Sequence, residues 1–322
     1  MKTFQHRPVL LEQAVTSLRV RGDGIYLDGT FGRGGHSRAI MAGLTEQGRL
    51  FSLDKDPQAV AAGLEEWAEE PKFSIVQGSF AEMDRMVQAW QIERNLDGIL
   101  LDLGVSSPQL DNPERGFSFR KGGPLDMRMD PTKGVSAAEW LAETPEREMT
   151  RVFWEFGEER HARRIARSIV KARQQQCLET TTQLAELIDR TIGKREKKHP
   201  ATRCFQAIRI VVNNELGDLA SGLEAAIRQL RPEGRLVAIS FHSLEDRLVK
   251  RTFREAVRPG RVRRNIPDHP DWFPRLKLIG KAIRPSEQEI SANPRARSAI
   301  MRVAEKLGST TQQSGKYRRA LN

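Results

Sequence analysis

The chain has 322 residues and a mass of 36.5 kDa, which suits one large domain or a domain that carries an insertion. The mean hydropathy is −0.55 and no uninterrupted apolar run approaches the roughly 18 residues that cross a bilayer, so we expect no membrane span. No apolar stretch follows the basic residues at the start of the chain, so we expect a cytoplasmic protein without a secretory signal.

Metal and disulfide chemistry are not expected. The two cysteines, Cys177 and Cys204, are too few and too far apart for a disulfide framework or a structural zinc site. The six histidines follow neither H-E-x-x-H nor C-x-x-C spacing.

The formal charge of +11 is concentrated at one end of the chain. Residues 250–322 carry 18 basic and 6 acidic side chains, whereas residues 1–249 are close to neutral. Because contacts to phosphates supply most nonspecific affinity for nucleic acids, this basic tail favours a polyanionic partner. A tail that only aids solubility would show the same composition.

The first hundred residues alternate short apolar runs with amphipathic stretches, which is the pattern of β-α units in a mostly parallel sheet. Strands are predicted at 25–28, 50–54, 73–76 and 98–102. The helices predicted between these strands cover 37–44, 57–69 and 81–89. Each helix is short enough for a crossover to a neighbouring parallel strand, so we expect an α/β fold with a doubly wound sheet.

The pattern changes after residue 102. Residues 104–131 contain four glycines and four prolines, which is typical of loops. Two helix start signals follow. Ser136 and Glu139 form a predicted capping box, and Thr144 is a predicted cap that is followed by a proline in the first turn. Helical spacing then extends over 146–175, 182–192 and 201–230.

The apolar run 236–241 is predicted as a fifth strand of the same sheet, 243–255 as a helix and 298–304 as a final strand. The helical stretch before residue 236 therefore interrupts the sheet. We place the core at 1–106 and 206–322 and a helical insertion at 107–205.

The strongest local pattern runs from Ile25 to Ser37, where an apolar strand leads into a glycine-rich turn and a helix. A dinucleotide-binding turn would end in Gly or Ala where Ser37 stands. An ATP-binding P-loop fails as well, because Gly193-Lys194-Arg195 has the wrong third residue and follows no strand. The remaining pattern, an acidic residue before the glycines, is typical of enzymes that bind S-adenosylmethionine.

Three aspartates end predicted strands. Asp28 ends the first and would favour the ammonium group of the cofactor, and Asp54 ends the second and can accept both ribose hydroxyls. Asp102 ends the fourth, at the edge where doubly wound sheets bind ligands. As simple helix caps, Asp28 and Asp54 would need no ligand.

Longer phrases resemble one family. They lie at 28–37, 102–110, 123–130, 199–203 and 240–247. Over essentially the whole chain the sequence resembles the bacterial 16S ribosomal RNA cytosine-N4 methyltransferases of the MraW type, also called the RsmH family. The resemblance departs mainly in the charged loop 193–198 and after residue 307.

This resemblance implies a Rossmann-like class I methyltransferase core with a helical insertion. It also implies transfer of a methyl group from S-adenosylmethionine to the exocyclic N4 of a cytidine in the decoding region of the small ribosomal subunit. The cofactor contacts that it implies are Gly34, Gly35, His36, Asp54, Phe80, Asp102 and Gln109.

The target amine needs an acceptor, because the N4 lone pair of cytosine is delocalised into the ring. Asp102, or the backbone near Ser107 and Pro108, could accept the N4–H hydrogen bond and help to remove the proton. Phe117 or Phe119 could stack on the target base, although both also suit a core. Methylation at C5 would need a thiolate, and Cys204 has no activating partner in the sequence.

We expect the helical insertion to be the RNA-substrate domain. RNA contacts are predicted at arginines of this insertion and of the basic tail. They are Arg128, Arg163, Arg164, Arg203, Arg261, Arg263 and Arg264. The expected partner is ribosomal RNA or the small ribosomal subunit. The sequence does not decide the oligomeric state, and a homodimer is one alternative. Buried pairing would explain Arg128 and Arg203 equally well.

Two other functions would account for parts of the sequence. A nicotinamide-dependent dehydrogenase is disfavoured by Ser37. A noncatalytic RNA-binding or assembly factor fits the basic tail but leaves the cofactor turn unexplained.

Overall fold

The computed structural model describes residues 8–92, 96–193, 199–258 and 273–308. The chain divides into two compact units, residues 1–104 with 217–322 and residues 105–216. Among the described residues, no helix is long and apolar enough to span a membrane.

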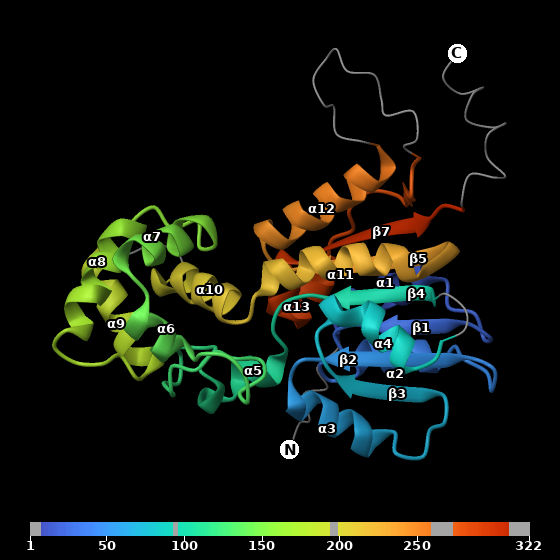
Figure 1. Cartoon of the computed structure of the whole chain (residues 1–322), viewed down its shortest axis with the longest axis horizontal. Coiled ribbons are helices and arrows are strands. Elements are labelled where there is room, and N and C mark those ends of the chain that lie inside the picture. Colours follow the sequence, from blue (N-terminus) through green and yellow to red (C-terminus); the bar gives the residue numbers. More distant parts are fainter. Residues whose placement is uncertain (1–7, 93–95, 194–198, 259–272, 309–322) are drawn as a thin grey trace, which may run out of the picture. The chain divides into compact units, whose positions relative to one another are not determined.

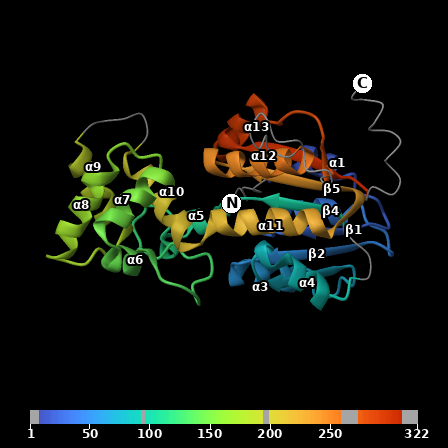
Figure 2. The ribbon, with the colours of Figure 1, turned by 45° about the horizontal axis from the view of Figure 1, so that its top comes forward.

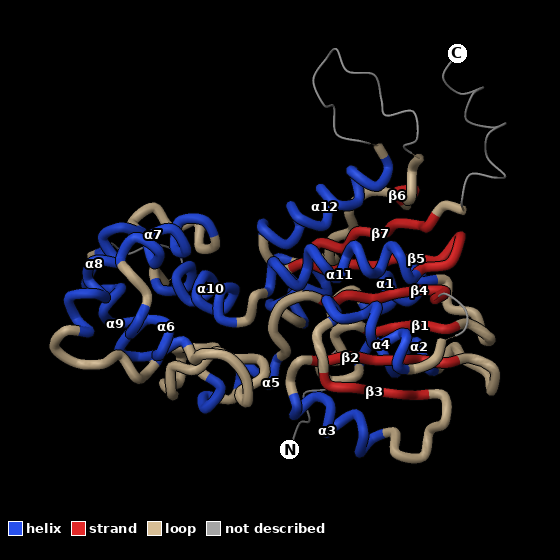
Figure 3. Tube along the Cα trace, viewed as in Figure 1, coloured by secondary structure: helices blue, strands red, loops and turns tan. Residues whose placement is uncertain are grey.

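The first unit is built on a seven-stranded sheet (Figure 1, Figure 3). Its strands are β1 (Ile25–Asp28), β2 (Arg49–Asp54), β3 (Phe73–Gln77), β4 (Leu96–Asp102), β5 (Leu230–Ser240), β6 (Leu276–Leu278) and β7 (Ile300–Lys306). They lie in the order β3-β2-β1-β4-β5-β7-β6. Strands β1 to β5 are parallel, and β7 runs antiparallel to β5 and β6. The predicted doubly wound, mostly parallel sheet is confirmed.

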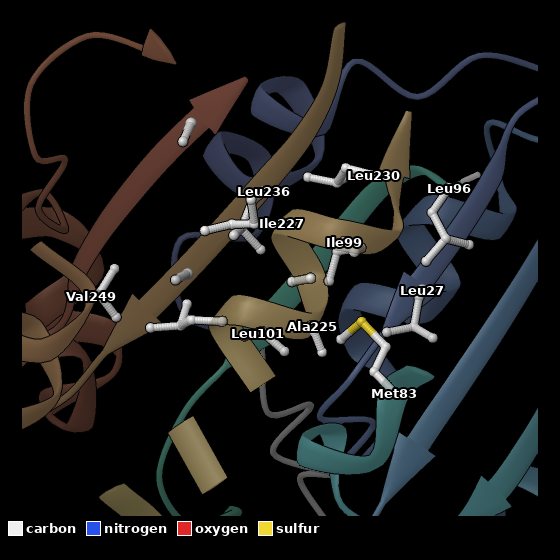
Figure 4. Close-up of a cluster of buried hydrophobic side chains, with 14 of the residues drawn as sticks. Leu27, Met83, Leu96, Ile99, Leu101, Ala225, Ile227, Leu230, Leu236 and Val249 are labelled. Carbon is white, nitrogen blue, oxygen red and sulfur yellow. The ribbon is translucent and has the colours of Figure 1, made fainter. Parts of the chain in front are cut away.

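One face of the sheet is covered by α4 (Met83–Ala89), α11 (Glu215–Gln229) and α12 (Ser243–Val257). Figure 2 shows α11 running along the sheet, and Figure 4 shows the core beneath it. There Leu27 and Ile99 of the strands meet Met83, Ala225 and Val249 of the helices. These apolar contacts fix α11 against the sheet.

The other face is covered by α1 (Leu11–Leu18), α2 (Gly35–Met41) and α3 (Pro57–Glu66). Leu18 and Ile40 pack there against Leu100 and Val237. Neighbouring residues of β4 point into opposite cores, so its Ile99–Leu101 segment is apolar, as expected for a parallel strand covered on both faces. A short helix, α13 (Glu287–Ala292), precedes β7.

The structure corrects the predicted start of the fifth strand. β5 begins at Leu230 rather than at residue 236, because Leu230 already pairs with Leu96. The register shifts between Leu96 and Gly98, and Glu233 has a positive φ of 66°, so β5 contains an irregularity before residue 236. β6 was not predicted, because its three residues carry no usable pattern.

The second unit is helical. Its helices are α5 (Ser107–Asp111), α6 (Ala137–Glu143), α7 (Glu146–Glu155), α8 (Ala162–Arg173), α9 (Thr181–Ile192) and α10 (Ala201–Val212). Leu141, Phe153, Ile165, Ile188 and Ile208 bring most of them into one core. The expected helical insertion is therefore present.

The predicted division at 205/206 falls inside α10. Cys204, Phe205 and Ile208 of this helix all pack into the core of the second unit. The second unit accordingly extends to residue 216.

Two long helical patterns are interrupted. Residues 146–175 form α7 and α8, separated by a turn in which Glu158 has a φ of 50°. Residues 201–230 form α10 and α11, with Asn214 at a φ of 51° between them. A residue with left-handed backbone conformation ends a helix, but the apolar spacing of the sequence on either side stays the same.

The two predicted caps differ in outcome. The capping box of Ser136 and Glu139 is confirmed at the start of α6. The predicted cap at Thr144 is wrong, because Thr144 ends α6 and Pro145 precedes α7 without a side-chain cap.

Asn213 ties the glycine- and proline-rich segment of the second unit to the end of α10. Its buried amide accepts a hydrogen bond from Met129 N (2.7 Å) and donates to Met127 O (2.8 Å) and Arg209 O (2.9 Å). Met127 has a φ of 62°, so this amide holds a residue in an unfavourable backbone conformation.

Replacing Asn213 by alanine is expected to lower the free energy of unfolding by about 2–3 kcal/mol, because buried backbone groups lose their partners. Urea denaturation measures the change. Gln174→Ala removes an exposed amide from the end of α8 and is the matched control. Equal stability of the two variants would show that Asn213 does not hold the segment.

Candidate active site

The candidate site lies at the carboxyl ends of β1, β2 and β4, three neighbouring parallel strands. Asp28 pairs in register with Ser52 of β2 and Leu100 of β4. Asp54 and Asp102 therefore each extend two residues beyond Asp28. The chain connections diverge on either side of β1, which makes this edge the topological switch point where open α/β sheets bind ligands.

Asp28 is buried and organises the turn that follows β1. Its carboxylate accepts hydrogen bonds from Ser37 Oγ (2.7 Å) and Thr30 N (3.1 Å). Burial raises the pKa of Asp28, and these two hydrogen bonds oppose the rise. Ser37 therefore occupies the place of the glycine or alanine of a dinucleotide turn because its hydroxyl binds Asp28.

The glycines of the turn are required by close packing as well as by backbone conformation. Gly34 has a φ of 68°, and a Cβ there would lie 2.7 Å from Phe31 Cζ. A Cβ on Gly35 would lie 2.1 Å from Pro8 Cγ. The segment before α1 therefore crosses directly over the turn.

Asp54 is held by backbone amides. Its two carboxylate oxygens accept hydrogen bonds from Gly32 N (2.7 Å) and Asp56 N (2.8 Å). Burial raises the pKa of Asp54 to about 6, although both hydrogen bonds lower it. Each oxygen keeps a lone pair, so the carboxylate can still accept from two hydroxyls.

Asp102 is the least satisfied carboxylate of the three. Its Oδ1 atom is buried and has no hydrogen-bond partner within the described residues. Burial, together with the charges of Asp28 and Glu245, raises the pKa of Asp102 well above its usual value. A ligand that is positively charged or donates a hydrogen bond would satisfy this oxygen.

His36 lies between Asp102 and the segment before α1. Its Nε2 is 3.2 Å from Val9 O, and its Nδ1 is 3.5 Å from Asp102 Oδ2. Burial lowers the pKa of His36 to about 4, which keeps the ring neutral near pH 7. The contact with the Val9 carbonyl assigns the ring hydrogen to Nε2, so Nδ1 offers a lone pair to Asp102.

Phe80 begins a short 3₁₀ helix (Phe80–Glu82) that follows β3. This turn is joined to the end of β2 by a hydrogen bond from Gly78 N to Asp54 O (2.9 Å). The first unit thus brings together the predicted residues Asp28, Gly34, Gly35, His36, Asp54, Phe80 and Asp102.

Ser107, Pro108 and Gln109 belong to the second unit, in α5. Gln109 is buried, and its Oε1 accepts a hydrogen bond from Ser106 N (2.9 Å) in a capping box. The carbonyls of Ser106 and Pro108 already accept from Leu110 N (3.3 Å) and Asn112 N (2.9 Å). These bonds make the α5 backbone a weaker acceptor for an amine than the free Asp102 Oδ1.

The predicted RNA-contacting arginines have different environments. Arg128 forms a paired hydrogen bond with Asp126, at 2.7 Å and 3.0 Å, and Arg203 is 3.7 Å from Glu159. Arg163 and Arg164 are exposed on α8. Arg261, Arg263 and Arg264 lie outside the described residues.

The aromatic and thiol candidates of the second unit lie in its core. Phe117 is buried, and the Phe119 ring contacts the rings of His199 and Phe205 at centroid distances of 4.6 and 4.8 Å. Burial raises the pKa of the Cys204 thiol well above its usual value, so no thiolate forms near pH 7. Methylation through a cysteine nucleophile stays disfavoured.

Sequence reasoning missed three residues that support the site. Ser37 and Thr30 hold Asp28, and Thr30 Oγ1 also accepts a hydrogen bond from Asp102 N (2.7 Å). Glu245 is buried, accepts from Phe241 N (2.7 Å) and raises the pKa of Asp102. All three lie inside phrases that the sequence singled out, but their roles depend on contacts across the sheet edge.

Several solved structures resemble this chain at low identity. A putative rRNA-methylase from Clostridium thermocellum is 11% identical, with a TM-score of 0.45, and the match covers 93% of this chain and 98% of that one. An rRNA methylase from Streptococcus thermophilus is 10% identical, with a TM-score of 0.42 and coverage of 94% and 99%. A putative methyltransferase from Streptococcus mutans, in complex with SAH, is 9% identical, with a TM-score of 0.42 and coverage of 92% and 97%.

The family assignment comes from the sequence of the chain. Residues 3–307 match the family described as the MraW methylase family, which confirms the resemblance seen in the sequence. The chain therefore belongs to the MraW methylase family, the S-adenosylmethionine-dependent enzymes that methylate N4 of a cytidine in 16S ribosomal RNA.

Proposed function

We propose that the carboxyl edge of β1, β2 and β4 binds S-adenosylmethionine and that Asp102 accepts the proton of the target amine. The observation that carries this proposal is the buried Oδ1 of Asp102, which has no partner among the described residues. The other carboxylates at this edge repel an ionised Asp102, so a cationic ligand is favoured there. When bound, S-adenosylmethionine supplies an electrophilic methyl group on a positively charged sulfur.

The surrounding residues suit the remaining parts of that molecule. Asp54 keeps lone pairs for the two ribose hydroxyls. Phe80 follows β3, in a turn that is hydrogen-bonded to the end of β2, and its ring suits the adenine. Gly34 and Gly35 keep the turn beside Asp28 compact, where the ammonium group would be favoured. The roles of Ser107, Pro108 and Gln109 remain proposals from the family pattern and from the chemistry of the amine.

Asp102 can take up one proton, and His36 can stabilise the protonated carboxyl group. When the bound cofactor transfers its methyl group to N4, the ionised Asp102 carboxylate would accept the proton that N4 loses. The protonated carboxyl group then donates a hydrogen bond to Nδ1 of the neutral His36, 3.5 Å away. His36 is too weak a base to take the proton itself, so its role is to stabilise the protonated Asp102.

The RNA partner is a consequence of family membership, and we propose that α8 provides one of its contacts. This helix carries basic but no acidic residues, and its exposed side chains include Arg163, Arg164, Arg167 and Lys171. Arg167 forms a long ion pair with Glu146, at 3.7 Å. Arg128, in contrast, donates a hydrogen bond of 2.7 Å to Asp126. A helix face of one charge sign is the expected electrostatic footprint of a polyanion.

We also propose that the substrate is the decoding region of the small ribosomal subunit and that the protein acts in the cytoplasm. The long sequence phrases shared with the family support the first point, and a ribosomal RNA substrate supports the second.

Asp102→Asn is expected to lower the turnover number by at least about a hundredfold, because the amide keeps the shape but cannot take up the proton. The assay uses purified protein, S-adenosylmethionine and unmodified 16S ribosomal RNA, with N4-methylcytidine detected by mass spectrometry. Binding of S-adenosylhomocysteine is expected to change by less than about threefold. Turnover within twofold of the parent protein would remove Asp102 from the chemistry.

Asp54→Ala is expected to weaken S-adenosylhomocysteine binding at least about tenfold at pH 8, because two hydrogen bonds to an ionised carboxylate are lost. The pKa of Asp54 is about 6, so at pH 5 the parent carboxyl is mostly protonated and the loss becomes smaller. Calorimetry at both pH values gives the ratio of the two dissociation constants. Using this ratio cancels the titration of other groups, and a ratio near one at pH 8 would contradict the ribose role.

Converting Arg163 and Arg164 to glutamate is expected to raise the Michaelis constant for RNA and to lower the salt slope of binding by about 0.7–0.9 for each lost contact. S-adenosylhomocysteine affinity serves as the folding control. A variant with Arg19 and Arg85 converted to glutamate has the same net charge and changes two exposed arginines of the first unit. Equal salt slopes for the two variants would exclude a specific contact on α8.

A further inference from the structure

We infer that α11 is part of the cofactor site and that Asp218 and Gly222 are positioning residues for the turn that carries Phe80. This inference rests on the proposed function of the carboxyl edge. The two residues are four apart, so they lie on the same face of the helix. They contact Ser79 and Phe80, which are consecutive in the chain.

Asp218 joins two loops that leave the carboxyl edge of the sheet. Its carboxylate accepts a hydrogen bond from Ser79 Oγ and lies 2.7 Å from Lys55 Nζ. The side chains of Asp218 and Lys55 are only 14% and 23% exposed, so water screens the pair weakly. Lys55 directly follows Asp54, so Asp218 links the proposed ribose acceptor to the turn before Phe80.

Ser79 connects Asp218 to the backbone of the turn that carries Phe80. While donating to Asp218, its Oγ also accepts a hydrogen bond from Ala81 N (3.1 Å), which caps the 3₁₀ helix that begins at Phe80. A second link runs from Gln77 Nε2 to Lys55 O (3.3 Å). The backbone on both sides of Phe80 is thereby fixed.

Gly222 sets the position of the Phe80 ring. A Cβ at this position would lie 2.3 Å from Phe80 Cδ2 and 2.8 Å from Phe80 Cε2, distances that real Cβ atoms do not adopt. On the other side, a Cβ on Gly29 would lie 3.1 Å from Phe80 Cβ. Phe80 therefore occupies a slot between the turn after β1 and α11.

The glycine is unusual for its place in the helix. Gly222 is buried near the middle of α11, where glycine is about 0.5–1 kcal/mol less favourable than alanine. The ring of Phe80 explains why alanine does not stand there. Because the slot determines where the ring lies relative to Asp54, α11 would set the fit of the adenosine half of the cofactor.

The test measures S-adenosylhomocysteine binding by calorimetry, together with the thermal midpoint and the Michaelis constant for S-adenosylmethionine. Gly222→Ala and Asp218→Asn are each expected to raise the dissociation constant and the Michaelis constant about tenfold, with turnover at saturating cofactor nearly unchanged. Ser221→Ala, exposed on the same helix, and Asp84→Asn are the matched controls. Asp84 joins α4 to the far end of α11 through Arg228 and Gln229, at 2.6 and 2.8 Å.

Double variants distinguish positioning from a general loss of stability. If Gly222→Ala acts through the ring, it should change binding by less than about twofold when Phe80 is already alanine. Asp218→Asn should likewise have little further effect when Ser79 is alanine. This second pair of variants does not depend on the folding of Gly222→Ala.

Binding within twofold of the parent for both single variants would overturn the inference, as would an undiminished effect of Gly222→Ala in the Phe80→Ala background. Failure of the parent protein itself to bind S-adenosylhomocysteine would instead overturn the proposed cofactor site, and this inference with it. The parent measurement therefore separates the two failures.

Discussion

The first unit depends on how the aspartates at three neighbouring strand ends are hydrogen-bonded. Asp28 accepts three hydrogen bonds and Asp54 two, whereas Asp102 Oδ1 accepts none within the described residues, and this difference separates their roles. Asp28 is satisfied by Ser37 and Thr30 and holds the turn, whereas Asp54 is held by two amides and keeps lone pairs free. Asp102 retains a buried oxygen with no partner among the described residues, so it is the carboxylate most ready to meet a ligand.

Glycines around this edge serve mainly to admit bulky neighbours. Gly34 lies against Phe31, Gly35 against Pro8, and Gly222 against Phe80. At all three positions an added Cβ would collide with a side chain of the protein itself. This packing fixes the positions of the turn, the segment before α1 and α11 relative to one another.

Much of the fold could be predicted because the central strands are covered on both faces and read as apolar runs. β1 to β4 were found within two residues of their ends for this reason. The helix breaks at Glu158 and Asn214 were missed, because a change in backbone conformation leaves the apolar spacing intact. The predicted cap at Thr144 is wrong because the residue directly before α7 is Pro145, which has no side-chain oxygen.

The site was only partly predictable for a different reason. Asp28, Asp54 and Asp102 could be named because a strand end marks each of them in the sequence. Asp218 and Ser79 are 139 residues apart, and nothing local in either segment indicates the other. The one available signal was Gly222 itself, since a glycine in the middle of an amphipathic helix needs a packing reason.

The sheet edge of the first unit and α8 of the second unit carry charged groups of opposite sign. The edge of the first unit gathers carboxylates, which favour a cationic cofactor, while the charged side chains of α8 in the second unit are all basic, which favours a polyanion. A single surface could not serve both ligands, because residues that attract phosphates would repel a sulfonium group. Inserting a separate helical unit between β4 and β5 lets one chain carry both kinds of surface without moving the aspartates from the strand ends.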